Sequence, residues 1–285
     1  MNAKLPGAGR VRPADRILRL IFRTVPDMPR FKLVIEYDGT RYSGWQIQPT
    51  ARTVQGMLVT AARRGFDGVG ESMGSGRTDS GVHALGQVAH LDIDTRAPAA
   101  AVLAAINENL PHDINVRLAT VVDRRFHARH DAAGRSYLYQ ISRRRSAFGK
   151  SYIWWVREPL DVGAMRRASL SMVGMHDYSA FTEAAKGESM KVLMTALEVV
   201  EAGELLLIRL RASHFLRKMA RRVVGALVAT GKGEIPVDAI SEALEAPHRA
   251  ELQITAPPSG LFLEEVIYRG EAFSRELRPA LVIGS

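Results

Sequence analysis

A glycine-rich loop that runs into an alternating strand is the feature that most constrains this chain. The loop, Gly74–Gly81, carries small residues that let the backbone turn tightly, with Arg77 and Asp79 in its second half. Beyond Gly86, apolar residues alternate with other residues as far as Asp94, which predicts a strand with one buried face. Asp79 therefore lies between a tight turn and a half-buried strand. A carboxylate in this position is suited to catalysis. The spacing alone is explained equally well by a turn residue whose side chain caps a backbone amide.

The residues around this loop argue against two common kinds of site. A phosphate-binding loop needs a glycine, four residues and then Gly-Lys-Ser/Thr, but in Gly65–Ser72 the lysine is replaced by Glu71. His83, His90 and Asp92 carry donor atoms, yet they lie on a loop and a strand with no cysteine to complete a metal site. Hydrogen-bonded or solvated roles are the better interpretation for these three, and we expect no metal site.

The bulk composition indicates a polyanionic partner. The chain has 285 residues, which suits two domains, and 46% hydrophobic residues supply a sizeable core. A net charge of +9 and a pI of about 10.1 favour nucleic acid over a membrane surface. The absence of cysteine excludes disulfides and thiolate chemistry and fits a reducing cytosol, so we expect a cytoplasmic protein. No apolar run approaches the roughly 20 residues of a membrane span.

Hydrophobic periodicity predicts strands and helices that alternate in two halves. In the first half we expect strands at Phe31–Tyr37, Gly86–Asp94 and Ile114–Val122, and helices after Thr53 and at Ala99–Leu110. In the second half we expect strands at Tyr137–Ser142, Leu193–Val200, Leu205–Ala212 and Leu261–Tyr268, and helices after Asp161 and at Phe215–Thr230 and Val237–Leu244. The domains implied are residues 30–133 and 134–270. A basic extension, residues 1–29, and a tail, residues 271–285, flank them; disorder is expected for the extension, with a short amphipathic helix at Ala14–Arg23 as the alternative.

Two basic stretches are candidates for an RNA-facing surface. On a helical wheel of Phe215–Thr230 the apolar residues fill one arc, and the opposite arc holds four basic residues: Arg217, Lys218, Arg221 and Arg222. The run Arg143–Arg145 follows a predicted strand and would add to the same face. Trp45 lies in a polar and aromatic loop, where it could stack on a base or cover a core edge.

Several motifs together resemble one enzyme family. Gly76–Ala84 is similar to the signature loop of the tRNA pseudouridine synthase A family. Further motifs follow in the order of that family: Glu36–Gly39, Tyr42–Gln48, Thr53–Gln55, Asn109–Ile114, Phe126–Arg129, Tyr137–Tyr139 and Phe215–Gly225. The resemblance runs from about Phe31 to Tyr268. It departs from the family at Ser80, commonly alanine there, and at Arg217 and Lys218, where other members often have histidines.

The resemblance implies a fold and an activity. The fold would be α+β, with two ferredoxin-like halves whose mainly antiparallel sheets join around a central active-site cleft. The activity would be isomerisation of uridine to pseudouridine in the anticodon stem-loop of tRNA, typically at positions 38 to 40. Neither a metal nor an organic cofactor is implied, and the protein would be a homodimer that binds tRNA across both subunits.

The resemblance also assigns roles within the site. Asp79 would be the catalytic nucleophile, Arg221 its partner across the cleft, and Tyr137 the residue at the target base; Arg77 is a second candidate arginine beside the carboxylate. Three other basic residues are candidates for substrate binding: Arg217, Lys218 and Arg222. Positive charge near Asp79 would favour its ionised form. The residues alone leave open whether the carboxylate attacks the sugar, attacks the base or acts on a proton.

Two rival hypotheses fit part of the sequence. A non-catalytic RNA-binding protein explains the charge and the basic helix, but gains nothing from a carboxylate placed among glycines. A metal-dependent nuclease would use Asp79, Asp92 and Asp94, and would lose activity in a chelator.

Overall fold

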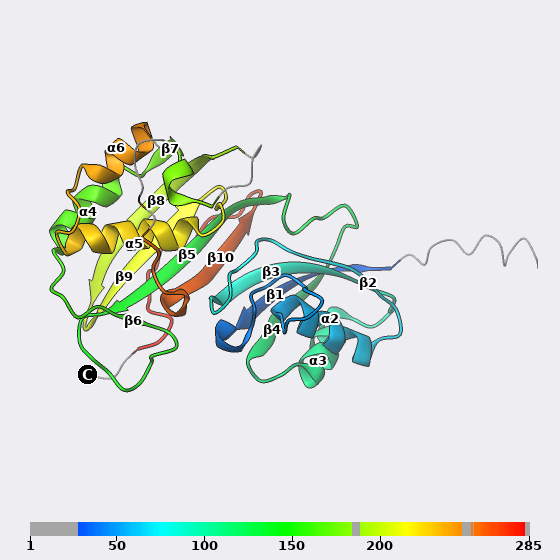
Figure 1. Cartoon of the computed structure of the whole chain (residues 1–285). Coiled ribbons are helices and arrows are strands. Elements are labelled where there is room, and N and C mark those ends of the chain that lie inside the picture. Colours follow the sequence, from blue (N-terminus) through cyan, green and yellow to red (C-terminus); the bar gives the residue numbers. More distant parts are fainter. Residues whose placement is uncertain (1–27, 184–188, 247–251, 253, 283–285) are drawn as a thin grey trace, which may run out of the picture.

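One ten-stranded sheet runs through the computed structural model, which describes residues 28–183, 189–246, 252 and 254–282 (Figure 1). Its strands are β1 (Arg30–Tyr37), β2 (Val69–Gly74), β3 (His83–Ile93), β4 (Ile114–Val122), β5 (Ala132–Ser142), β6 (Trp154–Trp155), β7 (Gly174–Asp177), β8 (Lys191–Ala202), β9 (Leu205–Ala212) and β10 (Leu261–Tyr268). The order along the sheet is β4-β1-β3-β10-β5-β9-β8-β7, with β2 beside β3 and β6 beside β5. The helix considered for Ala14–Arg23 lies outside the described residues.

Five α-helices occur in the described residues, joined by short 3-10 turns. They are α2 (Val54–Gly65), α3 (Ala99–Asn109), α4 (Val162–Leu170), α5 (Met219–Gly231) and α6 (Ala239–Glu245); the 3-10 turns are Gly39–Arg41, Ser179–Phe181 and Pro258–Gly260. Thr53 caps α2 by accepting from the Gly56 amide, and Asp161 caps α4 by accepting from the Ala164 amide. Within the same residues, no helix has both the length and the apolar character needed to cross a bilayer.

Each half of the sheet follows the same sequence of elements. In the first half, β1-α2-β2-β3-α3-β4 gives the strand order β4-β1-β3-β2. In the second half, β5, α4, β8, β9, α5 and β10 give the order β10-β5-β9-β8, with β7 added at the edge. This β-α-β-β-α-β order is that of a ferredoxin-like unit. The α+β class and the mainly antiparallel sheet expected from the sequence are confirmed.

The halves meet where the last strand lies beside β3. Phe262 pairs with His83 and Leu263 with Ala84, in a parallel arrangement, whereas most of the other strand pairs are antiparallel. His83 is the first residue of β3, so the junction lies immediately after the glycine-rich loop. The topology thus brings that loop to the seam between the two halves.

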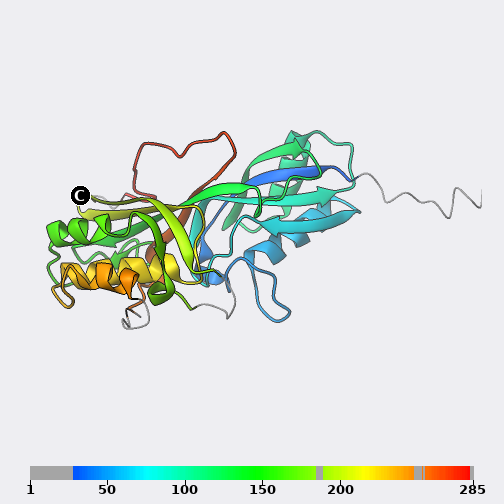
Figure 2. The same ribbon diagram turned by 90° about the horizontal axis from the view of Figure 1, so that it is seen from above.

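The two faces of the sheet are covered differently. Figure 2 shows the helices of both halves on one side and the segment after β10 on the other. The main core forms under the helices, whereas Leu277 and Ala280 of the C-terminal segment pack on a smaller cluster behind the sheet. That smaller cluster comprises Leu138, Ile153, Leu205, Leu207 and Phe262.

The structure corrects three details of the sequence-based prediction. Strand β2 was not predicted, because Val69–Gly74 contains two glycines and little apolar character. The expected boundary at residues 133/134 falls inside β5, which begins at Ala132. Strand β3 is buried on both faces rather than one, since the segment near Phe126 packs on the side that carries His90 and Asp92.

The start of α5 is a fourth correction. The predicted helix began at Phe215, but Lys218 has φ 60° and ψ 1°, so the helical backbone begins only at Met219. Phe215 instead packs its ring against Tyr137, with ring centroids 4.8 Å apart. The basic arc drawn on a continuous helix is therefore not present, because Arg217 and Lys218 precede the helix.

Candidate active site

The glycine-rich loop is held against the segment that follows β1. The Trp45 amide donates to the Thr78 carbonyl at 3.1 Å, and the hydroxyls of Tyr37 and Thr78 lie 2.8 Å apart. Gly44, at φ 89°, comes so close that a Cβ there would lie 2.4 Å from the Thr78 carbonyl oxygen. These contacts fix the backbone on which Asp79 lies. Trp45 itself is buried, so it covers the core edge and is not available to stack on a base.

A second set of contacts ties the loop to β3 and, through Arg135, to the other half of the protein. Gln87 accepts from the Ser75 hydroxyl at 2.7 Å and donates to the Gly76 carbonyl at 3.0 Å. The buried Arg135 of β5 donates to the carbonyls of Ser75 and Ser213, at 2.8 and 2.9 Å. Burial lowers the pKa of Arg135, and its charge is surrounded by carbonyl oxygens. The burial of Arg135 could not be predicted, because an arginine in a strand carries no sequence signal of being buried.

Asp79 and Arg221 meet across the seam, as the sequence analysis expected. The Arg221 Nη1 lies 3.2 Å from the Asp79 Oδ2, and the Arg221 Nε donates to the Ala256 carbonyl at 2.8 Å. The Asp79 side chain is 34% exposed and that of Arg221 15%. The guanidinium is thus shared between a carboxylate and a backbone carbonyl. One carboxylate oxygen is held, and the group remains accessible from solvent.

Tyr137 lies close to this pair on β5. It is buried, and burial together with the negative charge of Asp79 raises the pKa of its hydroxyl, so the phenol stays neutral. Its ring packs edge-on against Phe215. Tyr139, two residues along the same strand, instead donates its hydroxyl to the Pro257 carbonyl at 2.8 Å.

The other predicted site residues lie elsewhere. Arg77 is exposed and makes no hydrogen bond or ion pair with Asp79 in the described part of the chain. Arg222 is buried rather than turned to solvent, and its Nη1 donates to the Thr182 carbonyl at 2.7 Å. Arg217, Lys218 and Arg222 all form ion pairs with Glu183. The predicted basic face is thus partly neutralised by an acidic residue that the sequence analysis did not single out.

The acidic residues of the nuclease hypothesis do not gather at one point. Asp79 faces Arg221, whereas Asp92 pairs with Arg30 at 2.7 Å. Asp94 is exposed at the end of β3. Each of the first two carboxylates is compensated by its own arginine, which is not the arrangement of carboxylates around a shared metal ion.

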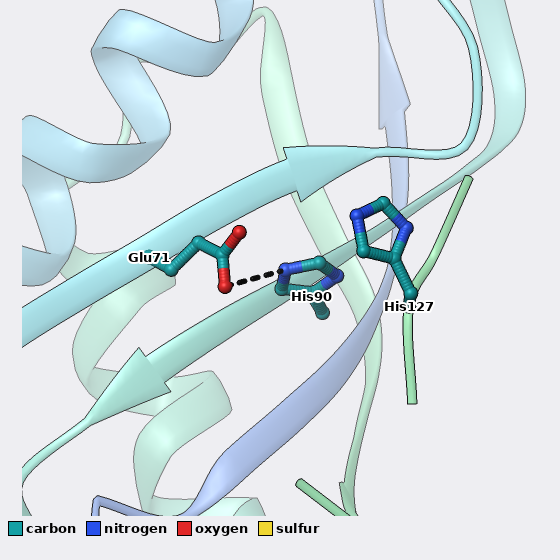
Figure 3. A group of neighbouring side chains, drawn as sticks. All are labelled: Glu71, His90 and His127. Atoms are coloured by element: carbon teal, nitrogen blue, oxygen red, sulfur yellow. Dashed lines mark ion pairs between the residues drawn. The ribbon is translucent and has the colours of Figure 1, made fainter. Parts of the chain in front are cut away.

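One different group of potential ligands was found among the described residues: Glu71, His90 and His127, whose ligand atoms lie within 4.8 Å of one another (Figure 3). The Nδ1 of His90 accepts from the Ala128 amide at 3.1 Å, and the Nδ1 of His127 accepts from the His130 amide at 3.1 Å. A neutral ring that accepts at Nδ1 carries its proton at Nε2, where a metal would need a lone pair. We therefore interpret His90 and His127 as rings held by backbone amides and not as ligands of a metal ion.

The charges around this cluster support the same interpretation. Arg30 donates to the Glu71 carboxylate at 2.7 Å, which places a cation where a metal ion would bind. Burial and the nearby charge of Arg30 lower the pKa of His90 to about 4, so the ring is neutral at pH 7. The His90 Nε2 is 3.7 Å from the nearest Glu71 oxygen and has no hydrogen-bond partner.

Comparison with known proteins places this geometry in a family. A family model described as tRNA pseudouridine synthase matches residues 33–131 and 168–269. The tRNA pseudouridine synthase A of Rhodopseudomonas palustris (strain HaA2) is 42% identical over 246 residues, which cover 85% of this chain and 100% of the relative. The enzyme of that name from Rhodospirillum rubrum is 41% identical over 248 residues, with 86% and 89% covered.

A solved structure was also found with weaker similarity. The crystal structure of the archaeal box H/ACA sRNP Nop10–Cbf5 complex aligns with 11% identity and a TM-score of 0.30, covering 80% of this chain and 58% of that chain. The assignment rests on the sequence comparisons, which span both halves of the sheet and include the loop that carries Asp79. The chain belongs to the tRNA pseudouridine synthase A family.

Proposed function

We propose that this protein isomerises uridine to pseudouridine in the anticodon stem-loop of tRNA, at positions 38 to 40, with Asp79 as the catalytic carboxylate. The observation that carries the proposal is the ion pair between Asp79 and Arg221 at the seam of the sheet, in a chain of this family. Arg221 holds the Asp79 carboxylate, which remains accessible from solvent. A catalytic group needs this access to contact its substrate.

The reaction fits a site that uses side chains alone. The bond between N1 of uracil and C1′ of ribose breaks, the base turns, a bond forms between C5 and C1′, and the C5 proton is lost while N1 gains a proton. There is no net redox change, so no electron-accepting cofactor is required. Asp79 acts as nucleophile in the first half of this sequence, at the sugar or at the base. The target base must leave its stack to reach the loop.

Arg221 and Tyr137 support the carboxylate in this proposal. Arg221 holds one carboxylate oxygen by a charge-assisted contact, which orients the other toward the substrate. Tyr137 supplies an apolar ring beside Asp79 and a neutral hydroxyl that can donate or accept a hydrogen bond at the flipped base. Arg77 is solvent-exposed on the same loop, where it could contact RNA phosphate.

The basic residues contribute to tRNA binding to different extents. Arg217 is the best placed for a phosphate contact, because its side chain is 70% exposed. Lys218 and Arg222 were proposed from the sequence for the same role, but Arg222 is buried and Lys218 is engaged by Glu183. The exposed run Arg143–Arg145 is a further candidate, although Arg143 pairs with Glu201.

We also propose that the protein acts as a homodimer in the cytoplasm, with the site in a cleft between the halves and tRNA bound across both subunits. The family resemblance motivates the dimer. The cytoplasmic location is supported by the absence of cysteine, which fits a reducing compartment.

The test is an activity assay on unmodified tRNA in the presence of a chelator. The protein is incubated with a tRNA transcript that has uridine at positions 38 to 40, and pseudouridine is mapped chemically. We expect modification at these positions, and none in a transcript with cytidine there. Tight tRNA binding without product would support the RNA-binding alternative, and cleavage that stops in chelator would support the nuclease.

A further inference from the structure

Lys218 has an unusual backbone conformation immediately before the helix of the site. Among the described residues it is the one residue other than glycine with a positive φ, 60°. A side chain with a Cβ is disfavoured in this left-handed region, and such strain persists where the surroundings impose it. Lys218 also occupies the N-cap position of α5 without a capping side chain. The turn therefore needs an external support.

Glu183 supplies that support. Its Oε1 lies 2.7 Å from the Lys218 Nζ and 3.1 Å from the Arg222 Nη2, and its Oε2 lies 3.7 Å from the Arg217 Nε. One carboxylate thus meets three cations that come from the left-handed turn and from the first turn of α5. Two charge-assisted hydrogen bonds and a longer ion pair thus converge on one carboxylate, which forms a network and not an isolated surface pair.

Hydrogen bonds from the neighbouring backbone fix the same two segments to each other. The Arg217 carbonyl accepts from the Thr182 hydroxyl at 2.9 Å and from the Glu183 amide at 3.4 Å. The Arg222 Nη1 donates to the Thr182 carbonyl at 2.7 Å. Arg222 is buried, so its guanidinium faces the protein and is not free for an RNA phosphate.

The position of this turn decides where Arg221 points. Met219 is the first residue of α5 and Arg221 the third, so the first helical turn carries the guanidinium that contacts Asp79. If Lys218 relaxed to a right-handed conformation, the start of the helix would shift, and Arg221 would move with it. A displacement of about 1 Å at a positioning group can cost about 100-fold in rate.

We propose that Glu183 is a positioning residue for the isomerisation: its carboxylate stabilises the left-handed turn at Lys218 and so holds the Arg221 guanidinium on Asp79. The inference rests on the proposed function, in which Arg221 orients the catalytic carboxylate. In this proposal Arg217, Lys218 and Arg222 stabilise the site within the protein itself, before any contact with tRNA.

The test compares Glu183→Gln, Lys218→Gly and the double variant. Glutamine keeps the size of the side chain but loses its charge, and glycine adopts the left-handed conformation without strain. We expect Glu183→Gln to lower kcat by about tenfold or more, with the Kd for tRNA unchanged. Lys218→Gly alone is the reference for the double variant, and any loss of tRNA affinity from the missing ammonium is measured separately as Kd. In the double variant most of the lost kcat should return, because the turn no longer needs the carboxylate.

Controls separate this proposal from other roles of Glu183. Glu201→Gln is the matched control, since Glu201 also pairs with two arginines, Arg143 and Arg166, outside the site; its kcat should not change. Thermal unfolding verifies that each variant is folded. A normal kcat in Glu183→Gln would overturn the proposal, as would a loss that Lys218→Gly fails to restore, or an effect confined to tRNA affinity. The wild-type protein, measured in the same assay, reports separately on the proposed function: no pseudouridine from wild type would refute that function whatever Glu183 does, whereas an active Asp79→Asn protein would refute only the role of Asp79.

Discussion

Two aspartate–arginine pairs in this protein have the same chemical partners and different environments. Asp92 and Arg30 have side chains about 10% exposed and meet through two contacts, Nε to Oδ1 at 2.7 Å and Nη2 to Oδ2 at 2.9 Å. Asp79 and Arg221 meet through one contact at 3.2 Å, and Asp79 is 34% exposed.

The difference lies in how completely each pair is satisfied. Arg30 also donates to the Phe126 carbonyl and to Glu71, so the buried pair has a full set of partners. A buried pair of this kind holds strands together and cannot reach a substrate. Asp79 keeps an oxygen that makes no hydrogen bond within the described residues, beside a neutral Tyr137. A buried pair whose hydrogen-bonding groups all have partners, such as Asp92 and Arg30, is therefore structural. A partly exposed pair with an unused carboxylate oxygen, such as Asp79 and Arg221, has the features of a reactive pair.

The largest expected effect is the loss of activity in Asp79→Asn. Asparagine keeps the size of the side chain but cannot act as a nucleophile at neutral pH, so we expect the rate of pseudouridine formation to fall by about 10⁴-fold or more. The melting temperature should be unchanged or higher, because active-site charges often destabilise the fold. Asp94→Asn, at the exposed end of β3, is the control and should stay active. Substantial product from folded Asp79→Asn protein would exclude Asp79 from the mechanism.

Asp92→Asn should show the opposite profile. Removal of one charge from the buried pair leaves Arg30 incompletely compensated, which should cost about 3 kcal/mol of unfolding free energy, at the lower end of the usual range because Glu71 remains. Urea denaturation measures this loss, and the rate per folded molecule should stay within a few-fold of wild type. A stable but inactive Asp92→Asn protein would contradict the division into structural and reactive pairs.

Arg221→Lys tests whether turnover depends on the ability of the guanidinium to make two contacts at once. An ammonium can replace the contact to Asp79 or the contact to the Ala256 carbonyl, but not both in the same geometry. We expect kcat to fall by about 10- to 100-fold with little change in the Kd for tRNA. Arg217→Lys, on an exposed arginine, should have no such effect on kcat. Normal turnover in Arg221→Lys would show that Arg221 acts through its positive charge alone and not through the geometry of its two contacts.

Tyr137→Phe and Tyr139→Phe extend the comparison to two tyrosines on one strand. Loss of the Tyr137 hydroxyl should slow turnover by about tenfold, as loss of one hydrogen bond to the reacting base does, with tRNA binding nearly unchanged. The Tyr139 hydroxyl is already bonded to Pro257, so its removal should lower stability by about 1 kcal/mol and leave turnover intact. Wild-type turnover in Tyr137→Phe would show that the hydroxyl has no role and that Tyr137 contributes only its ring, as a stacking surface.

The last expected effect is a dependence of stability on pH that originates beside the buried pair and is small at pH 7. The pKa of His90 is about 4 in the folded protein and about 6.5 in the unfolded chain, so between these values only the unfolded state binds the proton. The stabilising effect of the neutral ring is complete above pH 6.5 and declines as the pH falls toward 4, by at most about 1.4 kcal/mol per pH unit. His90→Asn retains an acceptor for the Ala128 amide and should remove this part of the slope in urea denaturation. An unchanged slope would mean that other groups dominate the acid sensitivity.

The fold could be predicted from the sequence where the signals are local. The caps at Thr53 and Asp161, and the hairpin of β8 and β9, follow from short patterns that the structure confirms. The pairing of Asp79 with Arg221 was expected from the family resemblance and not from spacing, since 142 positions separate the two residues.

What could not be predicted depends on contacts between distant residues. Nothing in Phe215–Met219 marks a helix break, because it contains neither glycine nor proline. The side chain of the left-handed Lys218 donates to Glu183, 35 positions away, a contact that no local pattern predicts. Arg135 and Arg222 belong to a residue type that is rarely buried. Several carbonyl oxygens converge on Arg135 in the folded chain, and Arg222 meets the Thr182 carbonyl and the Glu183 carboxylate.

The central position of β10 in the sheet determines when the fold can be completed during synthesis. This strand pairs with β3 through Phe262 and His83, two residues separated by most of the chain, and it is also the strand that joins the halves. Contacts of such long range form late in folding, and during synthesis the N-terminal part emerges first. The frame of the loop that carries Asp79 is therefore completed only after β10 has been made, so a nascent chain that still lacks β10 also lacks the seam at which Asp79 meets Arg221.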